Sequence, residues 1–311
     1  MENSTPIILT EGLTRKFKEN RAVDGLDLAI QPGELFGLVG PDGAGKTTTL
    51  RLLAGLLDIT EGSARVAGYD LKKSPENVKP KIGYMAQQFS LYAELSVDEN
   101  LTFFSELYDL DKTQIVDRRE SLLRFAGLTQ FRQRRAAQLS GGMQKKLSLA
   151  CTLIHRPPIL LLDEPTTGVD PVSRREFWNI LTDLHIQGNT ILISTPYMDE
   201  ADRCTRVGLM YHGRLVKCAP PQEIRSSIAG ELIELVPSDW KEAHELINQL
   251  PGVIESQTYG ESLHILVDSV EVRLPQIKQA LEDQGITCKN IRQTSPRMEE
   301  AFISMIRQIE D

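Results

Sequence analysis

The chain has 311 residues, of which 41% are hydrophobic, enough for about two domains with buried cores. Its 35 Lys+Arg against 43 Asp+Glu give a formal net charge of −8, which argues against nucleic acid as the main partner, since phosphate backbones attract basic surfaces. No apolar run reaches the roughly 18–20 residues of a membrane-spanning helix, and no secretion leader is recognisable. We therefore expect a cytoplasmic chain whose 4 scattered cysteines stay reduced.

The first part of the chain favours short strands followed by a buried one. Within the first thirty residues, Asp24-Gly25 predicts a turn before an alternating strand. The apolar run from Leu35 to Val39 is typical of a strand buried on both faces of a parallel sheet. A glycine-rich loop follows it. The next segment is expected to be a helix that buries Leu50, Leu53 and Leu57.

Helical and strand patterns then alternate. Residues from about 88 to 137 have helical periodicity, which predicts a helical subdomain inserted into the chain. Strand patterns return at 159–162, 190–194 and 207–211, and His212-Gly213 predicts a hairpin. Strands that alternate with helices indicate a doubly wound α/β core.

A domain boundary is expected at the Ala219-Pro220-Pro221 segment, which separates residues 1–220 from 221–311. The second part follows the order β-α-β-β-α-β with a last helix from Pro296, which predicts a small ferredoxin-like α+β domain. We find no catalytic constellation in it. Dimer stabilisation, regulation and passive packing all remain open for this domain.

Residues 40–47 match the phosphate-binding loop G-x-x-x-x-G-K-[ST], and the predicted strand before it and helix after it favour this over a simple glycine turn. Backbone N–H groups of such a loop and the helix N-terminus surround phosphates. Lys46 is expected to reach the β- and γ-phosphates of ATP, and the Thr47 hydroxyl to bind Mg²⁺. The expected nucleotide-binding residues are Gly40, Pro41, Asp42, Gly43, Ala44, Gly45, Lys46, Thr47 and Thr48.

Two adjacent carboxylates follow the apolar strand pattern at 159–162. An acidic residue at such a strand end holds Mg²⁺ in P-loop NTPases, which predicts that role for Asp163. Glu164 points differently and is the candidate catalytic residue that polarises the attacking water. The alternative, a strand that ends in a helix-capping Asp, becomes weak beside the phosphate-binding loop.

Residues 139–144, Leu-Ser-Gly-Gly-Met-Gln, resemble the signature motif of ABC transporter ATP-binding subunits, a short way before Asp163. The resemblance implies that Ser140 and the amides of Gly141 and Gly142 bind the γ-phosphate of a nucleotide held by an opposite subunit. A serine that merely caps a helix is the alternative. The resemblance covers residues 5 to about 220 and implies the ABC ATPase fold, with an antiparallel β-subdomain and a helical subdomain beside the core.

Further roles follow from the same resemblance. Gln87 corresponds to a glutamine that binds Mg²⁺ and water and takes part in catalysis, and Asp170 lies in a segment that crosses the dimer interface. Phe17 occupies the place of an adenine-stacking aromatic, although an ordinary core role remains open. Gln87 and the segment 89–97 are candidates for coupling to a membrane partner, although the aromatics of that segment could equally be core.

Segments around 89–97, 164–171 and 296–302 look like the ABC-2 exporter branch, and more like its drug and ion efflux members. The implied partners are a separate ABC-2-type transmembrane permease and a second ABC ATPase subunit, identical or different. Two Mg·ATP would be clamped between the subunits at the cytoplasmic face of the membrane. A soluble ABC ATPase acting on DNA or ribosomes is disfavoured, because we find no long coiled coil, zinc module or second cassette.

One residue departs from the family. Pro196 stands where ABC ATPases have a histidine that contacts the γ-phosphate, and proline offers neither an imidazole nor a backbone N–H. Loss of one positioned donor lowers such rates about 10²–10³-fold. We consider a slow site in an asymmetric heterodimer, a homodimer in which Thr195 or Glu164 suffices, and an essentially non-hydrolytic partner subunit. Retention of Glu164 argues against the last.

Overall fold

The computed structural model describes residues 5–108, 110, 112–228 and 230–310. The chain divides into two compact units, Met1–Pro220 and Pro221–Asp311. Within the described ranges, no helix is both long enough and apolar enough to cross a bilayer.

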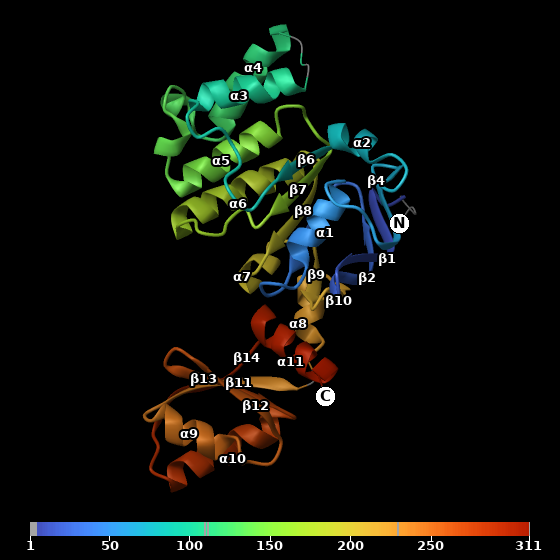
Figure 1. Ribbon diagram of the computed structural model, residues 1–311. Helices are drawn as coiled ribbons and strands as arrows, with labels where there is room; N and C mark the ends of the chain where they lie inside the picture. The colour runs from blue at the N-terminus through green and yellow to red at the C-terminus, as the bar shows by residue number, and fades with distance from the viewer. Residues whose placement is uncertain (1–4, 109, 111, 229, 311) are drawn as a thin grey trace. The chain divides into compact units, whose positions relative to one another are not determined.

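Unit 1 is built on a six-stranded sheet in the order β10-β9-β3-β8-β7-β6, parallel except for the antiparallel edge strand β10. All residues of the central strands β3 and β7 are buried, because helices cover both faces of the sheet (Figure 1). The doubly wound α/β prediction is confirmed. The strands are β3 (Leu35–Val39), β6 (Ile82–Met85), β7 (Ile159–Asp163), β8 (Thr190–Thr195), β9 (Arg206–Tyr211) and β10 (Arg214–Ala219).

An antiparallel sheet in the order β2-β1-β4-β5 lies beside this core. Its strands are β1 (Ile8–Phe17), β2 (Asn20–Ile30), β4 (Glu61–Val66) and β5 (Tyr69–Asp70). The turn predicted at Asp24-Gly25 was wrong, because β2 runs through it. Gly25 adopts a φ of +64° and its N–H bonds the Thr14 hydroxyl at a register shift of β1 against β2. The pair therefore forms a β-bulge, which uses the same left-handed conformation as a turn.

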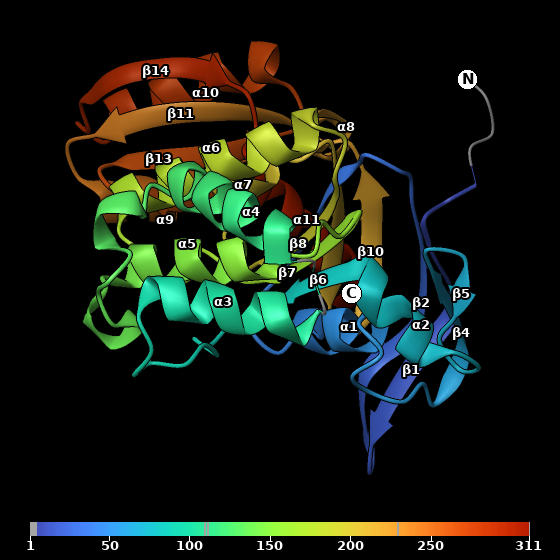
Figure 2. The ribbon, with the colours of Figure 1, turned by 90° about the horizontal axis from the view of Figure 1, so that it is seen from above.

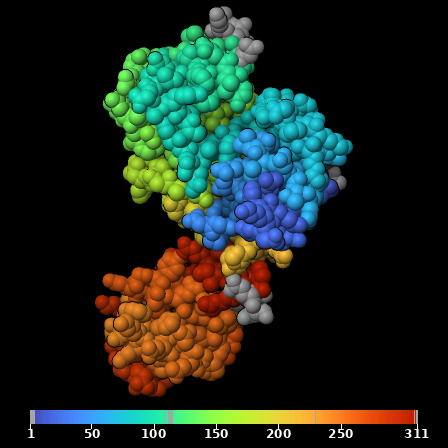
Figure 3. All heavy atoms as spheres, in the orientation of Figure 1, coloured from blue at the N-terminus to red at the C-terminus, as the bar shows by residue number. Residues whose placement is uncertain are grey.

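The helices of unit 1 include a group between β6 and β7. In Figure 1, α3, α4 and α5 gather at one end of the unit, and Figure 3 shows the α3 and α4 segments, coloured cyan to green, as one lobe of its surface. In Figure 2, α5 lies between α3 and α6. The helices are α1 (Lys46–Leu53), α2 (Pro75–Val78), α3 (Val97–Leu107), α4 (Lys112–Phe125), α5 (Gly141–Thr152), α6 (Pro171–Ile186) and α7 (Met198–Ala201).

Unit 2 contains a four-stranded antiparallel sheet in the order β12-β13-β11-β14, the ferredoxin-like order that its element sequence predicts. Helices α9 and α10 bury one face, with Ile233, Ile265 and Ile277 in the core. Helix α10 begins at Val270, whose side chain joins the core, and it contains Pro275. The elements are α8 (Pro221–Ser226), β11 (Glu231–Pro237), α9 (Trp240–Ile247), β12 (Val253–Tyr259), β13 (Ser262–Val267), α10 (Val270–Asp283), β14 (Cys288–Thr294) and α11 (Met298–Glu310).

Candidate functional site

The loop between β3 and α1 is shaped by glycines that no other residue can replace without strain. A Cβ on Gly40 would lie 2.1 Å from the Met210 carbonyl oxygen. Gly45 adopts a φ of +103°, and a Cβ there would lie 2.2 Å from the Ala22 carbonyl oxygen. The loop therefore passes close to backbone of β2 and β9, and α1 starts directly after it with its free N–H groups facing the loop.

We expect Gly45→Ala to lower the free energy of unfolding of unit 1 by about 1–3 kcal/mol and to weaken nucleotide binding, because the loop must shift. Gly43→Ala is the matched control: Gly43 also has a positive φ of +78°, but a Cβ there meets nothing within 4 Å. Thermal unfolding and nucleotide titration of both variants measure the difference. Equal losses of unfolding free energy and of nucleotide affinity in the two variants would contradict the steric argument.

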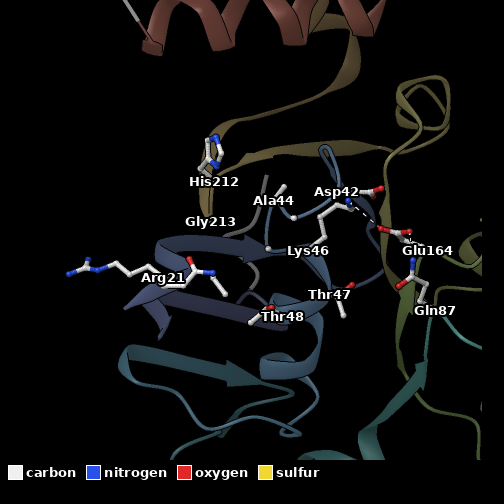
Figure 4. Close-up of a pocket in the computed structure, with 14 residues that line it drawn as sticks. Arg21, Asp42, Ala44, Lys46, Thr47, Thr48, Gln87, Glu164, His212 and Gly213 are labelled. Atoms are coloured by element: carbon white, nitrogen blue, oxygen red, sulfur yellow. Dashed lines mark hydrogen bonds and ion pairs between the residues drawn. The ribbon is translucent and has the colours of Figure 1, made fainter. Parts of the chain in front are cut away.

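A cavity of about 450 Å³ opens over this loop (Figure 4). Its lining includes residues 42–48 of the predicted set, together with Gln87 and Glu164. The rest of the wall was not predicted: Asn20, Arg21 and Ala22 at the start of β2, and His212 and Gly213 in the β9–β10 hairpin. The hairpin itself was expected, but its position beside the loop depends on sheet packing.

Lys46 and Glu164 meet inside this cavity. Lys46 is 3% exposed, and its Nζ donates to the carbonyl oxygens of Gly40 at 2.8 Å and Pro41 at 2.9 Å. The same Nζ lies 3.2 Å from the Glu164 carboxylate. Glu164 adopts a φ of +45°, which turns its side chain away from the direction of β7, and it accepts a hydrogen bond of 2.8 Å from Gln87 Nε2. Figure 4 shows the three side chains pointing toward one another.

Asp163 provides the oxygen atoms that a hard cation needs. Its Oδ1 accepts hydrogen bonds from Thr47 Oγ1 at 2.9 Å and from Ser194 Oγ at 2.8 Å. Its Oδ2 is buried without a hydrogen-bond partner among the described residues. Mg²⁺ prefers such carboxylate and hydroxyl oxygens, so Thr47 and Asp163 fit the ion. Gln87 is held at the same site by its hydrogen bond to Glu164.

The remaining predicted residues lie outside the described lining of this cavity. Ser140 caps α5 and accepts a hydrogen bond from the Met143 N–H at 3.3 Å; Gly141 and Gly142 form the first turn. Asp170 caps α6. Its carboxylate accepts hydrogen bonds from the N–H groups of Ser173 and Val172, and these bonds lower its pKa. Phe17 is 43% exposed at the end of β1, with the Arg15 guanidinium 4.7 Å above its ring.

Sequence reasoning missed Lys145, which connects α5, the helix that begins in the signature motif, to the site. Its Nζ donates to the Gln87 carbonyl oxygen at 2.5 Å. Burial lowers the pKa of the Lys145 ammonium, and the charges of Asp163 and Glu164 partly oppose that shift. Lys145 is the fifth residue of α5, and no local motif indicates that its side chain faces Gln87.

A buried carboxylate behind the site was also missed. Glu200 is 1% exposed and accepts hydrogen bonds from Thr166 at 2.8 Å, Trp178 Nε1 at 3.0 Å and Thr195 at 2.6 Å. Thr195 is the last residue of β8, and its carbonyl oxygen accepts a hydrogen bond from the Gly40 N–H at 3.3 Å. Pro196 therefore follows a residue that is bonded directly to the phosphate-binding loop.

These features define a P-loop nucleotide-binding protein: a glycine loop between β3 and α1, with the carboxylates at the end of neighbouring β7. The family model described as "ABC transporter" matches residues 23–167. The chain belongs to the ABC transporter family and carries its ATP-binding domain.

Named relatives agree with this. The probable multidrug ABC transporter ATP-binding protein YbhF of Escherichia coli (strain K12) is 40% identical over 305 residues, 96% of this chain and 52% of the relative. This chain thus spans about half the length of YbhF. The daunorubicin resistance ATP-binding protein DrrA2 of Streptomyces coeruleorubidus is 32% identical over 303 residues, 96% of this chain and 94% of the relative.

Solved structures show the same fold. The dimeric post-hydrolysis structure of the ATP-binding cassette MJ0796, bound to ADP and Pi, superposes with a TM-score of 0.63 at 26% identity. The match covers 68% of this chain and 98% of that one.

Proposed function

We propose that this chain binds and hydrolyses ATP and thereby energises an ABC-2-type exporter through a separate membrane permease. The observation that carries the proposal is the convergence of Lys46, Glu164 and Gln87 on one cavity, beside the Thr47–Asp163 pair. The relatives YbhF, a probable multidrug ABC transporter protein, and DrrA2, a daunorubicin resistance protein, support drugs as the transported class. We place the assembly at the cytoplasmic face of the membrane.

In the proposed reaction, Lys46 holds the β- and γ-phosphates, which replace Glu164 as its counter-ion. The carboxylate is then free to polarise the attacking water. Thr47, Asp163 and Gln87 would hold Mg²⁺, which supplies charge neutralisation at the phosphate oxygens. The ion pair of 3.2 Å between Lys46 and Glu164 supports this exchange of partners.

We further propose that two cassettes, identical or different, close on two nucleotides. Ser140, Gly141 and Gly142 stand at the N-terminus of α5, where free N–H groups and the helix dipole favour an anion. They do not line their own chain's described cavity, which supports a role toward a nucleotide on the opposite subunit. Asp170 and the adenine contact of Phe17 remain part of the same proposal.

Coupling to the permease is assigned to Gln87 and the segment 89–97. Tyr92 in that segment is 49% exposed, which supports a surface role, and Asn100 holds the loop by accepting from the Tyr92 N–H at 3.0 Å. Residues 88–137 are proposed as the helical subdomain that transmits the motion. For the domain 221–311 we retain dimer stabilisation or regulation as the functional hypothesis, with packing as the alternative.

The test of the enzymatic part is phosphate release by the purified chain at saturating Mg·ATP. We expect slow turnover, because Pro196 supplies no donor to the γ-phosphate. Release no faster than that of the Lys46→Ala variant would contradict hydrolysis by this chain alone.

Pro196→His is expected to raise steady-state ATP turnover at least about tenfold, because residue 196 follows Thr195 at the loop and an imidazole there regains a donor. Phosphate release measures the rate. Pro196→Ala is the control, because it removes the ring and restores the backbone N–H without supplying an imidazole. Brisk turnover by the unmodified chain, unchanged in Pro196→His, would favour a homodimer in which the histidine is dispensable.

A further inference from the structure

A second cavity, of about 310 Å³, lies in unit 1 away from the phosphate-binding loop. Its walls come from α4, the turn after α5 and the end of α6. Pro157 and Asn189 in its lining stand just before β7 and β8. The cavity is therefore at the amino ends of the parallel strands, whereas the nucleotide cavity is at their carboxyl ends, and the two share no lining residue.

Two arginines line this cavity without a described acidic partner. Arg118 Nη2 donates to the Leu153 carbonyl oxygen at 2.7 Å, while its Nε is buried and has no hydrogen-bond partner in the described structure. Burial, followed by the charge of Arg156, lowers the pKa of the Arg118 guanidinium. Burial lowers the pKa of His155, and the charge of Arg118 adds to that shift. The lining contains no carboxylate among the described residues.

Among the described lining residues, no acidic side chain balances this positive charge. Guanidinium groups bind carboxylate and phosphate oxygens in pairs of parallel hydrogen bonds, and they do so most strongly where water is excluded. The hydrogen bond to the Leu153 carbonyl oxygen uses one donor of Arg118; the other guanidinium donors need acceptors, and Nε has none among the described residues. Arg156 lines the same cavity and its side chain is exposed, so an anion from solvent can reach its guanidinium group.

The other walls determine what the anion is attached to. Leu122, Phe125 and Leu184 give the cavity an apolar side, and its volume lies at the lower end of small-molecule sites. We propose that this cavity binds a small amphipathic anion: a phosphate monoester or carboxylate attached to one compact apolar group. The anion bridges Arg118 and Arg156, and the apolar group packs against Phe125.

The test uses the full chain saturated with Mg·ADP, which occupies the phosphate-binding loop, and titrates it calorimetrically with phenyl phosphate and, separately, benzoate. We expect one site per chain with a Kd of about 1 mM or tighter for at least one of the two probes. Comparing the probes distinguishes a phosphate from a carboxylate ligand.

Arg156→Gln is expected to weaken the binding at least about tenfold, and Arg156→Lys to weaken it less, because lysine keeps the charge but not the paired donors. Arg124→Gln, an exposed arginine of the same α4 that does not line the cavity, is expected to bind like the original chain. Unchanged thermal unfolding of Arg156→Gln excludes a folding defect.

The proposal is overturned if neither probe binds up to its solubility limit. It is also overturned if Arg156→Gln binds as tightly as the original chain, or if Mg·ADP abolishes all probe binding, which would place the probe on the phosphate-binding loop.

Discussion

Glu164→Gln is expected to lower steady-state ATP hydrolysis by about 10²–10³-fold while ATP binding is retained. Glutamine keeps the size of the side chain and can still accept the hydrogen bond that Gln87 donates at 2.8 Å. It loses the negative charge that polarises water and that pairs with Lys46 at 3.2 Å. Because the phosphates no longer compete with a carboxylate for Lys46, ATP affinity is expected to rise rather than fall.

Phosphate release and equilibrium binding of ATP measure the two effects separately, and size-exclusion chromatography with light scattering then reports whether the Mg·ATP-loaded variant forms dimers. Glu76→Gln is the matched control, because Glu76 is an exposed carboxylate that pairs with Lys79 and is not among the described residues that line the nucleotide cavity. If the Glu164→Gln variant keeps more than about a tenth of the original rate of hydrolysis, a group other than Glu164 polarises the attacking water.

Glu200→Ala is expected to destabilise unit 1 by about 3 kcal/mol or more. The substitution leaves the buried donors of Thr166, Trp178 and Thr195 without their acceptor, and each unsatisfied buried group costs about 1–3 kcal/mol. It also opens a space beside Trp178, which is 1% exposed. Because Thr195 is bonded to Gly40, the phosphate-binding loop is expected to lose order in the same variant.

Denaturant unfolding followed by Trp178 fluorescence in a Trp240→Phe background isolates unit 1, since Trp240 belongs to unit 2. The control is the neighbouring Asp199→Ala. The Asp199 side chain is 63% exposed, and the substitution removes its ion pair of 2.7 Å with Arg174. Such an exposed pair contributes about 0–1 kcal/mol. Similar losses in the two variants would show that the Glu200 network does not stabilise the unit.

Motifs and periodicities that are local in the chain could be recognised from the sequence alone. The phosphate-binding loop at 40–47 is one continuous segment, so its geometry follows from its own glycines and the helix behind it. Apolar runs predicted the buried strands β3 and β7 because burial on both faces requires uninterrupted hydrophobic residues. The ferredoxin-like order of unit 2 likewise follows from the alternation of its patterns.

Contacts between distant segments could not be predicted, because the types of side chain in a segment do not indicate which other segment packs against it. The tertiary structure decided that Lys145 reaches Gln87, that Glu200 links Thr166 with Thr195, and that His212 lines the nucleotide cavity. It also decided that Asp24-Gly25 forms a bulge, since the dipeptide permits a positive φ in either setting. The sequence by itself determined the elements and the phosphate-binding chemistry; the packing of sheets and helices decided which charges face one another.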